Sequence, residues 1–573
     1  MKLHYSISIE TPENHIVKVK LTGKREATDK HLNFFLPSWS PGSYLMREYS
    51  RNIRWFKAET SNGEVLQHEQ TAKGVYAVDF ENSDLNKKDD NFCITYEIYC
   101  HELTVRTSHV DASHAFLHGP SYLMGIMGRD LVDPELSLKF PASWSKVTTG
   151  LKDISPKREE FLYSAENYDV LIDAPIEIGC HETDGFMFEG KEHHLAWYGD
   201  LLPHNENLKK DIEVIVKEVS STFSSIPYEN YTFITHFVPG KFGGLEHLNS
   251  TALQFSAMAM QNRKSYLQWL ALVAHEYFHT WNVKRIRPKE LGPFDYLNEN
   301  YTKMHWLTEG LTSFMDEVFI LRCGLCTMEE YLEMQKENLN RYLSTPGRKF
   351  HSLEDSSFNA WIKLYRPDEN SLNSSVSYYN KGGIVFWCLN ALLVKEGKKI
   401  DDLLNLLWKS YLDRPEQGLE AEEVFSMVRE IAGEEVLGQF QTWVQTTEEL
   451  DLDGLFKGAG FEIEYETKEK PWLGLRPDFL GDRVIIKDVA LDGPAYKGGL
   501  NAGDEIIAIN KMRILKDNFN DHEKYLFKDK PYMITVNRLE TLVNLEVIPS
   551  SAPRVIKNIK VTDTQVAEAT LKR

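Results

Sequence analysis

The spacing of the apolar residues changes twice along this 573-residue chain, and the change limits the folds open to it. Residues 1–168 alternate between apolar and polar, which is typical of strands with one buried face and predicts a β-sandwich. Residues 169–458 carry long amphipathic helical patterns, and residues 466–552 return to short strands with glycine turns. Residues 553–573 are polar and predict a loosely held C-terminal tail. We therefore expect a multidomain α+β protein.

Composition narrows the classes of function. Apolar residues make up 42% of the chain and aromatic residues 12%, which is enough for packed cores. The formal net charge of -20 repels phosphate backbones, so we expect no nucleic-acid partner. The sequence has no run of about 18 apolar residues, so we expect no membrane span. No apolar stretch follows Lys2, so we expect no secretory signal. Six cysteines are too few for a disulfide scaffold, so we expect a cytoplasmic protein; its oligomeric state stays open.

One segment has the spacing of a metal site. His275-Glu276-Tyr277-Phe278-His279 forms the pattern H-E-x-x-H in an apolar stretch without Pro or Gly. Residues four apart lie on one face of a helix, so the imidazoles of His275 and His279 can converge on one ion. Neutral imidazole suits Zn²⁺, and Glu276, one step round the helix, can reach the attacking water as a general base. Taken alone, the motif also fits two ordinary histidines on a helix face.

A carboxylate further along the chain strengthens the metal hypothesis. A catalytic zinc takes three protein ligands and leaves one position open. Glu309 stands in the apolar segment 306–314, where an unpaired carboxylate would be costly and a metal would offset that cost. We predict one Zn²⁺ per chain, held by His275, His279 and Glu309. Asp316, two helical turns after Glu309, is a candidate for orienting a ligand, and a solvent-facing position fits it equally well.

Two other segments carry candidate substrate contacts. Tyr378 and Tyr379 stand just before a helical pattern, and a phenol aimed at the reacting carbonyl can donate a hydrogen bond to the oxyanion. Ordinary aromatic packing fits both residues as well. Gly243 and Gly244 would let a substrate backbone approach closely, and Glu246 could pair with a cationic group there. A turn with solvated polar side chains is the alternative for this second segment.

Together these segments resemble the glycyl aminopeptidase family, gluzincin zinc aminopeptidases whose members carry a C-terminal PDZ domain. The resemblance covers nearly the whole chain. It rests on five motifs: Leu36-Pro-Ser-Trp39-Ser-Pro41-Gly42-Ser-Tyr44, Gly243-Gly244-Leu245-Glu246-His247, His275-Glu-Tyr-Phe-His279-Thr-Trp-Asn282, Trp306-Leu-Thr-Glu309-Gly310 and Tyr379-Asn-Lys381-Gly382. It implies a thermolysin-like, mainly helical catalytic domain over residues 169–458, and a preference for small N-terminal residues such as Gly or Ala.

The resemblance also implies roles for single residues. Glu246 would bind the free α-amino group of a peptide, which gives an aminopeptidase rather than an endopeptidase. Glu276 would activate the zinc water and later protonate the leaving amine. Tyr379 would stabilise the oxyanion. His247 agrees with the glycyl aminopeptidases, but the broader gluzincin aminopeptidases carry Asn there, so its role in substrate binding stays open.

The spacing between His279 and Glu309 is longer than the eighteen residues usual in the broader gluzincin aminopeptidases. We expect residues 283–301 to form an insertion that loops outward. The first part of this insertion carries Lys284, Arg285 and Arg287. A solvated, basic helix end is the expected setting for these three residues.

The C-terminal strands resemble a PDZ domain. The pattern runs Ala495-x-x-x-Gly499-Leu500-x-x-Gly503-Asp504-x-Ile506-x-x-Ile509-Asn510. The resemblance implies a carboxylate-binding loop made of Trp472, Leu473, Gly474 and Leu475. Its N–H groups could capture a peptide C-terminus while the peptide adds a strand. A domain that only packs on the catalytic part and binds nothing fits equally well.

The expected function is removal of the N-terminal residue from peptides by a zinc-activated water. A zinc endopeptidase is the first alternative, favoured if Glu246 points away from the metal. A non-catalytic scaffold that binds peptides through its PDZ domain is the second, favoured by bound zinc without turnover. The scaffold has no reason to keep Glu276. A structural zinc site is disfavoured because such sites usually fill all four positions with Cys and His.

Overall fold

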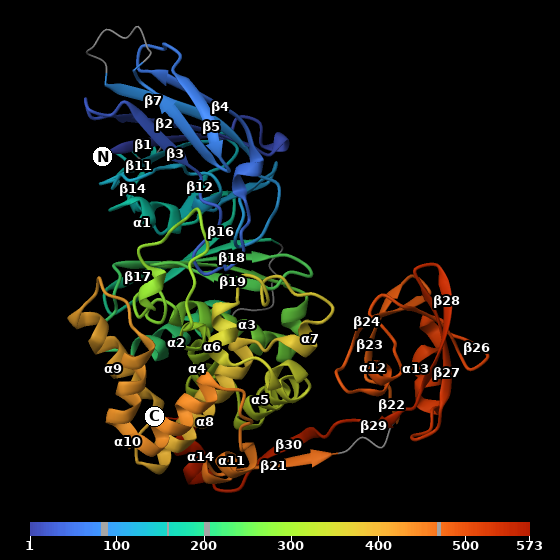
Figure 1. Cartoon of the computed structure of the whole chain (residues 1–573). Helices are drawn as coiled ribbons and strands as arrows, with labels where there is room; N and C mark the ends of the chain where they lie inside the picture. Colours follow the sequence, from blue (N-terminus) through green and yellow to red (C-terminus); the bar gives the residue numbers. More distant parts are fainter. Residues whose placement is uncertain (82–89, 158–159, 200–206, 467–470, 573) are drawn as a thin grey trace. The chain divides into compact units, whose positions relative to one another are not determined.

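The computed structural model describes residues 1–81, 90–157, 160–199, 207–466 and 471–572 (Figure 1). The start of the expected PDZ segment, 467–470, lies outside these ranges. The chain divides into two compact units. Unit 1 contains Met1–Asn300 and Ser410–Gly418, and unit 2 contains Tyr301–Lys409 and Leu419–Arg573. Within the described ranges, no helix has the length and apolar character needed to cross a membrane.

The N-terminal part of unit 1 is built from strands, as predicted. Its seven-stranded sheet has the order β13 (Lys152–Asp153), β14 (Phe161–Ser164), β11 (Glu135–Lys139), β1 (Leu3–Ser8), β2 (Ile16–Lys24), β7 (Asn91–Tyr99) and β4 (Ile53–Thr60). Two four-stranded sheets follow, with the orders β10 (Gly125–Ile126), β3 (His31–Phe35), β6 (Val75–Asp79), β5 (Gln67–Ala72) and β12 (Lys146–Thr149), β15 (Ile176–Gly179), β9 (His114–Leu117), β8 (His109–Val110). Alternate residues of β1 (Leu3, Tyr5 and Ile7) lie in the core, because successive side chains of a strand point to opposite faces.

The rest of unit 1 contains a mixed sheet and three helices, one of which, α3, packs against the sheet. The sheet has the order β16 (Glu182–Phe188), β17 (Lys191–Tyr198), β18 (Asn230–Phe237), β20 (Ser250–Phe255) and β19 (Gly243–Glu246). The helices are α1 (Tyr168–Asp173), α2 (Leu208–Ser220) and α3 (Arg263–Phe278). Strands β17, β18 and β20 run parallel, and β19 returns antiparallel to β20. Helix α3 begins at Arg263. The side chain of the preceding Asn262 caps it by accepting from the N–H of Lys264 at 2.9 Å, and the helix packs against β19 and β20.

The segment 283–301 does not loop outward, so that expectation is wrong. The Tyr296 side chain is buried in the core of the N-terminal sheets, and its hydroxyl donates to Asp169 at 2.6 Å. The Trp39 indole N–H donates to the carbonyl of Asp295 at 2.8 Å. Buried aromatic area therefore holds this segment against the N-terminal strands of unit 1.

Unit 2 is mainly helical at first. It contains a π-helical turn (Trp306–Gly310), α4 (Leu311–Arg322), α5 (Met328–Leu343), α6 (Leu353–Phe358), α7 (Ser371–Ser374), α8 (Tyr378–Lys395), the start of α9 (Ile400–Asp413), α10 (Ala421–Gln445) and α11 (Leu452–Gly458). Helix α8 is buried along most of its length and contacts α4, α10 and α11. It is therefore the central helix of this unit.

The C-terminal strands of unit 2 form a small sheet with a core of its own. The sheet contains β23 (Leu475–Leu480), β24 (Arg483–Val489), β25 (Glu505–Ile509), β27 (Tyr532–Arg538) and β28 (Thr541–Val547), and β26 (Met512–Arg513) pairs with β25. Two helices, α12 (Pro494–Lys497) and α13 (Lys516–Tyr525), accompany it. Leu473, Ile486, Ile506 and Val536 are among its buried core residues.

The C-terminal segment is not a loose tail. Strand β30 (Val555–Val561) pairs antiparallel with β21 (Phe461–Glu466), and Figure 1 shows the two side by side. Helix α14 (Thr564–Leu571) follows and packs on α4 and α8. Ala567 and Leu571 are buried, and this burial at helical spacing explains why the segment is ordered despite its polar composition.

Candidate active site

Helix α3 brings the two histidines of the H-E-x-x-H motif together. The ring centroids of His275 and His279 lie 4.6 Å apart with the planes nearly perpendicular. The Nδ1 of His279 lies 2.7 Å from the carbonyl oxygen of Asn282, so this nitrogen carries the proton. The other nitrogen, Nε2, keeps its lone pair for a metal ion, which is the usual arrangement of a metal-ligating histidine.

Two carboxylates lie beside His279. Glu246 on β19 and Glu276 on α3 are both buried, and one ligand atom from each lies within 4.8 Å of the other and of a His279 ring nitrogen. Like charges this close repel strongly away from water. A cation bound between them would offset that repulsion.

Gly244 permits this approach of β19 to α3. A Cβ added at Gly244 would lie 2.1 Å from the Oε1 of Glu276, which is closer than any real contact. The sequence suggested that this glycine makes room for a substrate backbone. In the structure it makes room for the expected general base.

Residues of the N-terminal part of unit 1 lie against Glu246 and its strand. Gly42 has φ +82°, and a Cβ there would lie 2.5 Å from the Oε1 of Glu246. The Arg106 guanidinium donates to the carbonyl of Gly244 at 3.0 Å and so fixes β19. A cavity of about 480 Å³ is lined by Gly42, Glu246 and His247 among others.

His247 belongs to a buried charged network. Its Nδ1 lies 3.4 Å from Asp173, which pairs with the Lys284 ammonium at 2.8 Å and accepts from the backbone N–H of Leu248 at 2.6 Å. Burial raises the pKa of Asp173, but Lys284 and His247 outweigh it and hold this pKa below its ordinary value. Asp173 is therefore ionised and orients His247 within the cavity wall.

The expectation of a solvated basic helix end is wrong for Lys284 and Arg285. Lys284 is the partner of Asp173. The Arg285 side chain is buried and donates to the carbonyls of Leu248, Thr280 and Pro227 at 3.1, 2.7 and 2.6 Å. Arg287 is half-buried. These residues fasten the loop after α3 because their hydrogen bonds replace solvent.

Unit 2 carries the other predicted residues. Glu309 is buried in the π-helical turn that precedes α4, a kind of irregularity common at functional sites. Burial raises the pKa of the Tyr379 phenol well above its ordinary value, and the negative charge of Glu309 adds to the effect. Tyr379 is therefore a protonated hydrogen-bond donor at neutral pH. Its hydroxyl lies 3.4 Å from that of Tyr365.

Two glycines hold Glu309 and Tyr379 near each other. A Cβ added at Gly382 on α8 would lie 2.8 Å from the Cα of Gly310. The last residues of the two motifs thus meet backbone to backbone. Tyr378, by contrast, is fully buried. Its ring stacks on that of Tyr379 and lies near that of His305, so aromatic packing explains why a tyrosine stands there.

Comparison with known proteins decides the family. Residues 268–385 match the model of the M61 glycyl aminopeptidase, residues 4–180 match the M61 N-terminal domain, and residues 455–523 match a PDZ domain. The chain belongs to the M61 glycyl aminopeptidase family. It is therefore a peptidase, and family membership makes it a metallo-aminopeptidase. The predicted α+β class with a C-terminal PDZ domain is confirmed.

Solved structures agree with this assignment. An aminopeptidase N family protein from Idiomarina loihiensis is 27% identical, with all of both chains covered and a TM-score of 0.92. An M1 zinc metallopeptidase from Deinococcus radiodurans is 13% identical over 79% of this chain and 95% of the other, with a TM-score of 0.50. At that identity the second likeness shows a shared fold.

Two remaining predictions concern residues outside these clusters. Asp316 on α4 is half-buried, and its orienting role stays a prediction. In the M61 chain, the residues expected for the PDZ loop connect β22 (Pro471–Trp472) to β23. Gly474 has φ +75°, Leu473 is buried, and the carbonyls of these two residues accept from the N–H groups of Ala490 and Ala495 at 2.8 and 2.7 Å. Peptide capture there stays a prediction.

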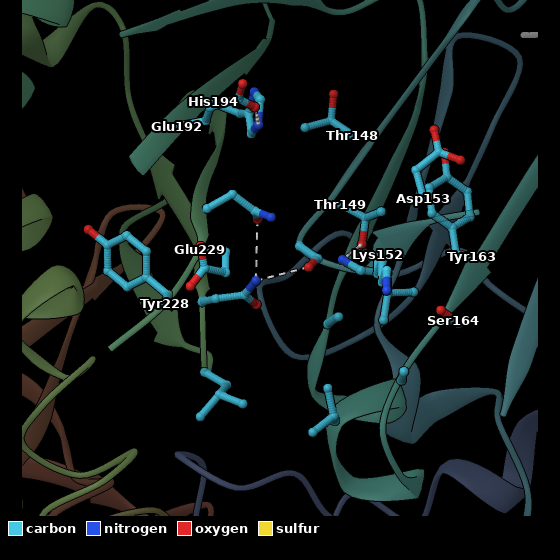
Figure 2. A pocket seen from close by; sticks show the side chains of 18 of the residues that line it. Thr148, Thr149, Lys152, Asp153, Tyr163, Ser164, Glu192, His194, Tyr228 and Glu229 are labelled. Atoms are coloured by element: carbon cyan, nitrogen blue, oxygen red, sulfur yellow. Dashed lines mark hydrogen bonds and ion pairs between the residues drawn. The ribbon is translucent and has the colours of Figure 1, made fainter. Parts of the chain in front are cut away.

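Sequence reasoning missed Arg106 and Asp173. Both lie far along the chain from the motifs that they support, and neither stands in a recognisable pattern. A second cavity, of about 950 Å³, contains none of the predicted site residues. Figure 2 shows Thr149 and Lys152 on one side of it and Glu192 and His194 on the other.

Proposed function

We propose that this peptidase is a zinc aminopeptidase that removes small N-terminal residues, Gly or Ala, from peptides. The observation that carries the proposal is the pair of buried carboxylates, Glu246 and Glu276, beside His279. A peptide's N-terminal ammonium is a cation of the right size to bind one of them. An endopeptidase, whose substrate has no such ammonium near the scissile bond, gains nothing from Glu246.

The donor set suits the metal. His275 and His279 would offer imidazole nitrogens and Glu309 a carboxylate, which is the ligand class that zinc peptidases use. The His279 hydrogen bond to Asn282 leaves the correct nitrogen for an ion. When bound, zinc would polarise the scissile carbonyl and make water a stronger nucleophile at neutral pH.

Each of the chain's own residues then has a separate role in hydrolysis. Glu246 pairs with the substrate ammonium and sets the distance from the N-terminus to the reacting carbonyl. Glu276 takes a proton from the attacking water and returns it to the leaving amine. The protonated phenol of Tyr379 donates a hydrogen bond to the oxyanion. His247, held by Asp173, lines the cavity beside Glu246.

The proposed preference for small residues follows from the family, the glycyl aminopeptidases. The PDZ domain would bind a peptide C-terminus through Trp472, Leu473, Gly474 and Leu475.

The test compares glycyl-, alanyl- and leucyl-p-nitroanilide with their N-acetylated forms. We expect wild type to cleave only the free amines, glycyl and alanyl faster than leucyl. Glu246→Gln should lower kcat/KM for the free amines by roughly ten- to a hundredfold, since a charge-assisted hydrogen bond contributes about 1.5–3 kcal/mol. Cleavage of the acetylated forms by wild type would instead show an endopeptidase.

A further inference from the structure

We propose that the β8–β9 hairpin of unit 1 holds a metal site, for Zn²⁺ or an ion of its class, on His109, Asp111 and His114. One ligand atom from each residue lies within 4.8 Å of the others. The three residues sit at the ends of two paired strands and in the turn that joins them. None of them belongs to the motifs assigned to peptide hydrolysis.

His109 is prepared to act as a ligand. Its Nδ1 lies 2.6 Å from the carbonyl oxygen of His101, so Nδ1 carries a proton and donates it. In the neutral ring, Nε2 then faces Asp111 Oδ2 with a lone pair, at 3.1 Å. Two acceptors facing each other repel, and an ion bound by both removes the repulsion. Two ligands of one tetrahedral zinc, with bonds of roughly 2.0–2.2 Å, lie about 3.3 Å apart.

His114 is oriented in the same way, by a hydrogen bond from its Nδ1 to a carboxylate rather than to a carbonyl. Its Nδ1 lies 2.7 Å from Oε1 of Glu177, and neither side chain is more than 1% exposed. A histidine that donates to a carboxylate is the common support of a metal ligand. Its other nitrogen, Nε2, is buried and has no hydrogen-bond partner in the described part of the chain.

Asp111 completes the set from the solvent side. Its Oδ1 accepts from the backbone N–H groups of Ser113 and His114 at 2.7 and 3.2 Å, which fixes the turn and leaves Oδ2 facing His109. The Asp111 side chain is 37% exposed. An ion can therefore enter from solvent and keep water in its remaining position, as a three-ligand site requires.

A neighbouring trio, His114, Glu177 and His236, also has ligand atoms within 4.8 Å of one another. Its carboxylate oxygens are engaged by ring nitrogens at 2.7 and 2.9 Å, and all three side chains are buried. An ion would have to break both hydrogen bonds and would have no path from solvent. We therefore assign the trio to supporting His114.

The test is zinc binding by the full-length protein, measured by equilibrium dialysis and metal analysis. Asp111→Asn removes the ligand charge but keeps an amide oxygen for the turn, and His109→Ala removes a nitrogen. His194→Ala is the control, since this histidine is 47% exposed on β17 and outside the hairpin. Co²⁺ absorption in the visible range reports on nitrogen and oxygen ligation.

We expect Asp111→Asn and His109→Ala each to bind one zinc fewer than wild type. Thermal unfolding and glycyl-p-nitroanilide hydrolysis should stay near the wild-type values, which shows that the variants fold. His194→Ala should bind as wild type, and His279→Ala should keep the hairpin ion whatever the fate of the proposed catalytic site. Zinc content equal to wild type in the folded Asp111→Asn variant would overturn the proposal, because a proton rather than a metal then bridges His109 and Asp111.

Discussion

Single side chains in this protein acquire their chemistry from residues distant in the sequence. Glu246 lies against Gly42, and Asp173 is kept ionised by Lys284 and His247. The sequence predicted the H-E-x-x-H residues because a fixed spacing on one helix determines a shared face. It indicated Glu246 through the neighbouring Gly243 and Gly244 and through the family resemblance. It missed Arg106 and Asp173, because only tertiary folding brings Arg106 to β19 and Asp173 to the residues that follow β19.

The two adjacent tyrosines of α8 should differ in their effect on catalysis. Tyr379 is expected to donate to the oxyanion, and Tyr378 is a buried packing residue. Tyr379→Phe should lower kcat by about 10²–10³ with a small change in KM, as loss of one oxyanion donor does. Tyr378→Phe is the matched control and should change kcat less than about tenfold. Equal losses in the two variants would remove Tyr379 from its role.

A buried histidine should make stability depend on pH. Burial lowers the pKa of His193 from its ordinary value of 6.5 to about 4, and its Nε2 lies 2.8 Å from the Tyr228 hydroxyl. Between these values the unfolded chain binds a proton that the folded chain does not. The free energy of unfolding therefore falls as pH falls through this window, by up to about 3 kcal/mol from this residue.

His193→Gln, which keeps a polar partner for Tyr228, tests this effect. The loss of unfolding free energy between pH 7 and pH 4.5, measured with urea, should be smaller in the variant than in wild type. An identical loss in both proteins would show that His193 is not the source.

Among the elements, the hydrophobic period indicated the N-terminal strands and the helices of unit 2. It did not indicate strands β15 to β20 inside the segment 169–458, nor how the elements pack. Tyr378 and Tyr379, expected just before a helical pattern, are the first two residues of α8, because Ser377 caps the helix. The close contact of α8 with the π-helical turn depends on two glycines, and no periodic pattern reports such a contact.

Adjacent glycines on α8 provide a direct test of that contact. Gly382→Ala would place a methyl group 2.8 Å from Gly310, so we expect a loss of about 1–3 kcal/mol in unfolding free energy and a fall in kcat as Glu309 and Tyr379 shift. At Gly383 the nearest atom is 3.5 Å away. Gly383→Ala should therefore be neutral or stabilising by up to about 1 kcal/mol, as in an ordinary helix. Thermal and urea unfolding distinguish the two outcomes.

At the scale of the whole molecule, the PDZ domain is an insertion between two paired strands. Strands β21 and β30 precede and follow it, and its ends meet where Trp472 pairs with Ser550. The sequence indicated the domain from its glycine pattern. It did not indicate that the chain after the PDZ domain returns to pair with β21 and to pack on α4 and α8. The reason is that β30 and α14 are short and polar on their outer faces.

This arrangement predicts unequal effects of two deletions. Joining residue 472 to residue 550 through a short Gly-Ser linker should leave glycyl-p-nitroanilide hydrolysis within about threefold of wild type, because the ends already lie together. Removing residues 555–573 should lower the melting temperature clearly, because it uncovers α4 and α8. A tail that can be removed without loss of stability would contradict the structure.

We propose that Glu276 is the general base of a metal-dependent hydrolysis next to a free N-terminus. The most direct measurement is the rate of glycyl-p-nitroanilide hydrolysis by wild type and by Glu276→Gln, with bound zinc measured on the same samples. We predict that Glu276→Gln keeps its zinc and folds normally but loses about 10²–10⁴ in kcat, and that chelation abolishes wild-type turnover until zinc is restored. Wild-type protein that binds zinc without cleaving the substrate, or a Glu276→Gln variant as active as wild type, would contradict the account.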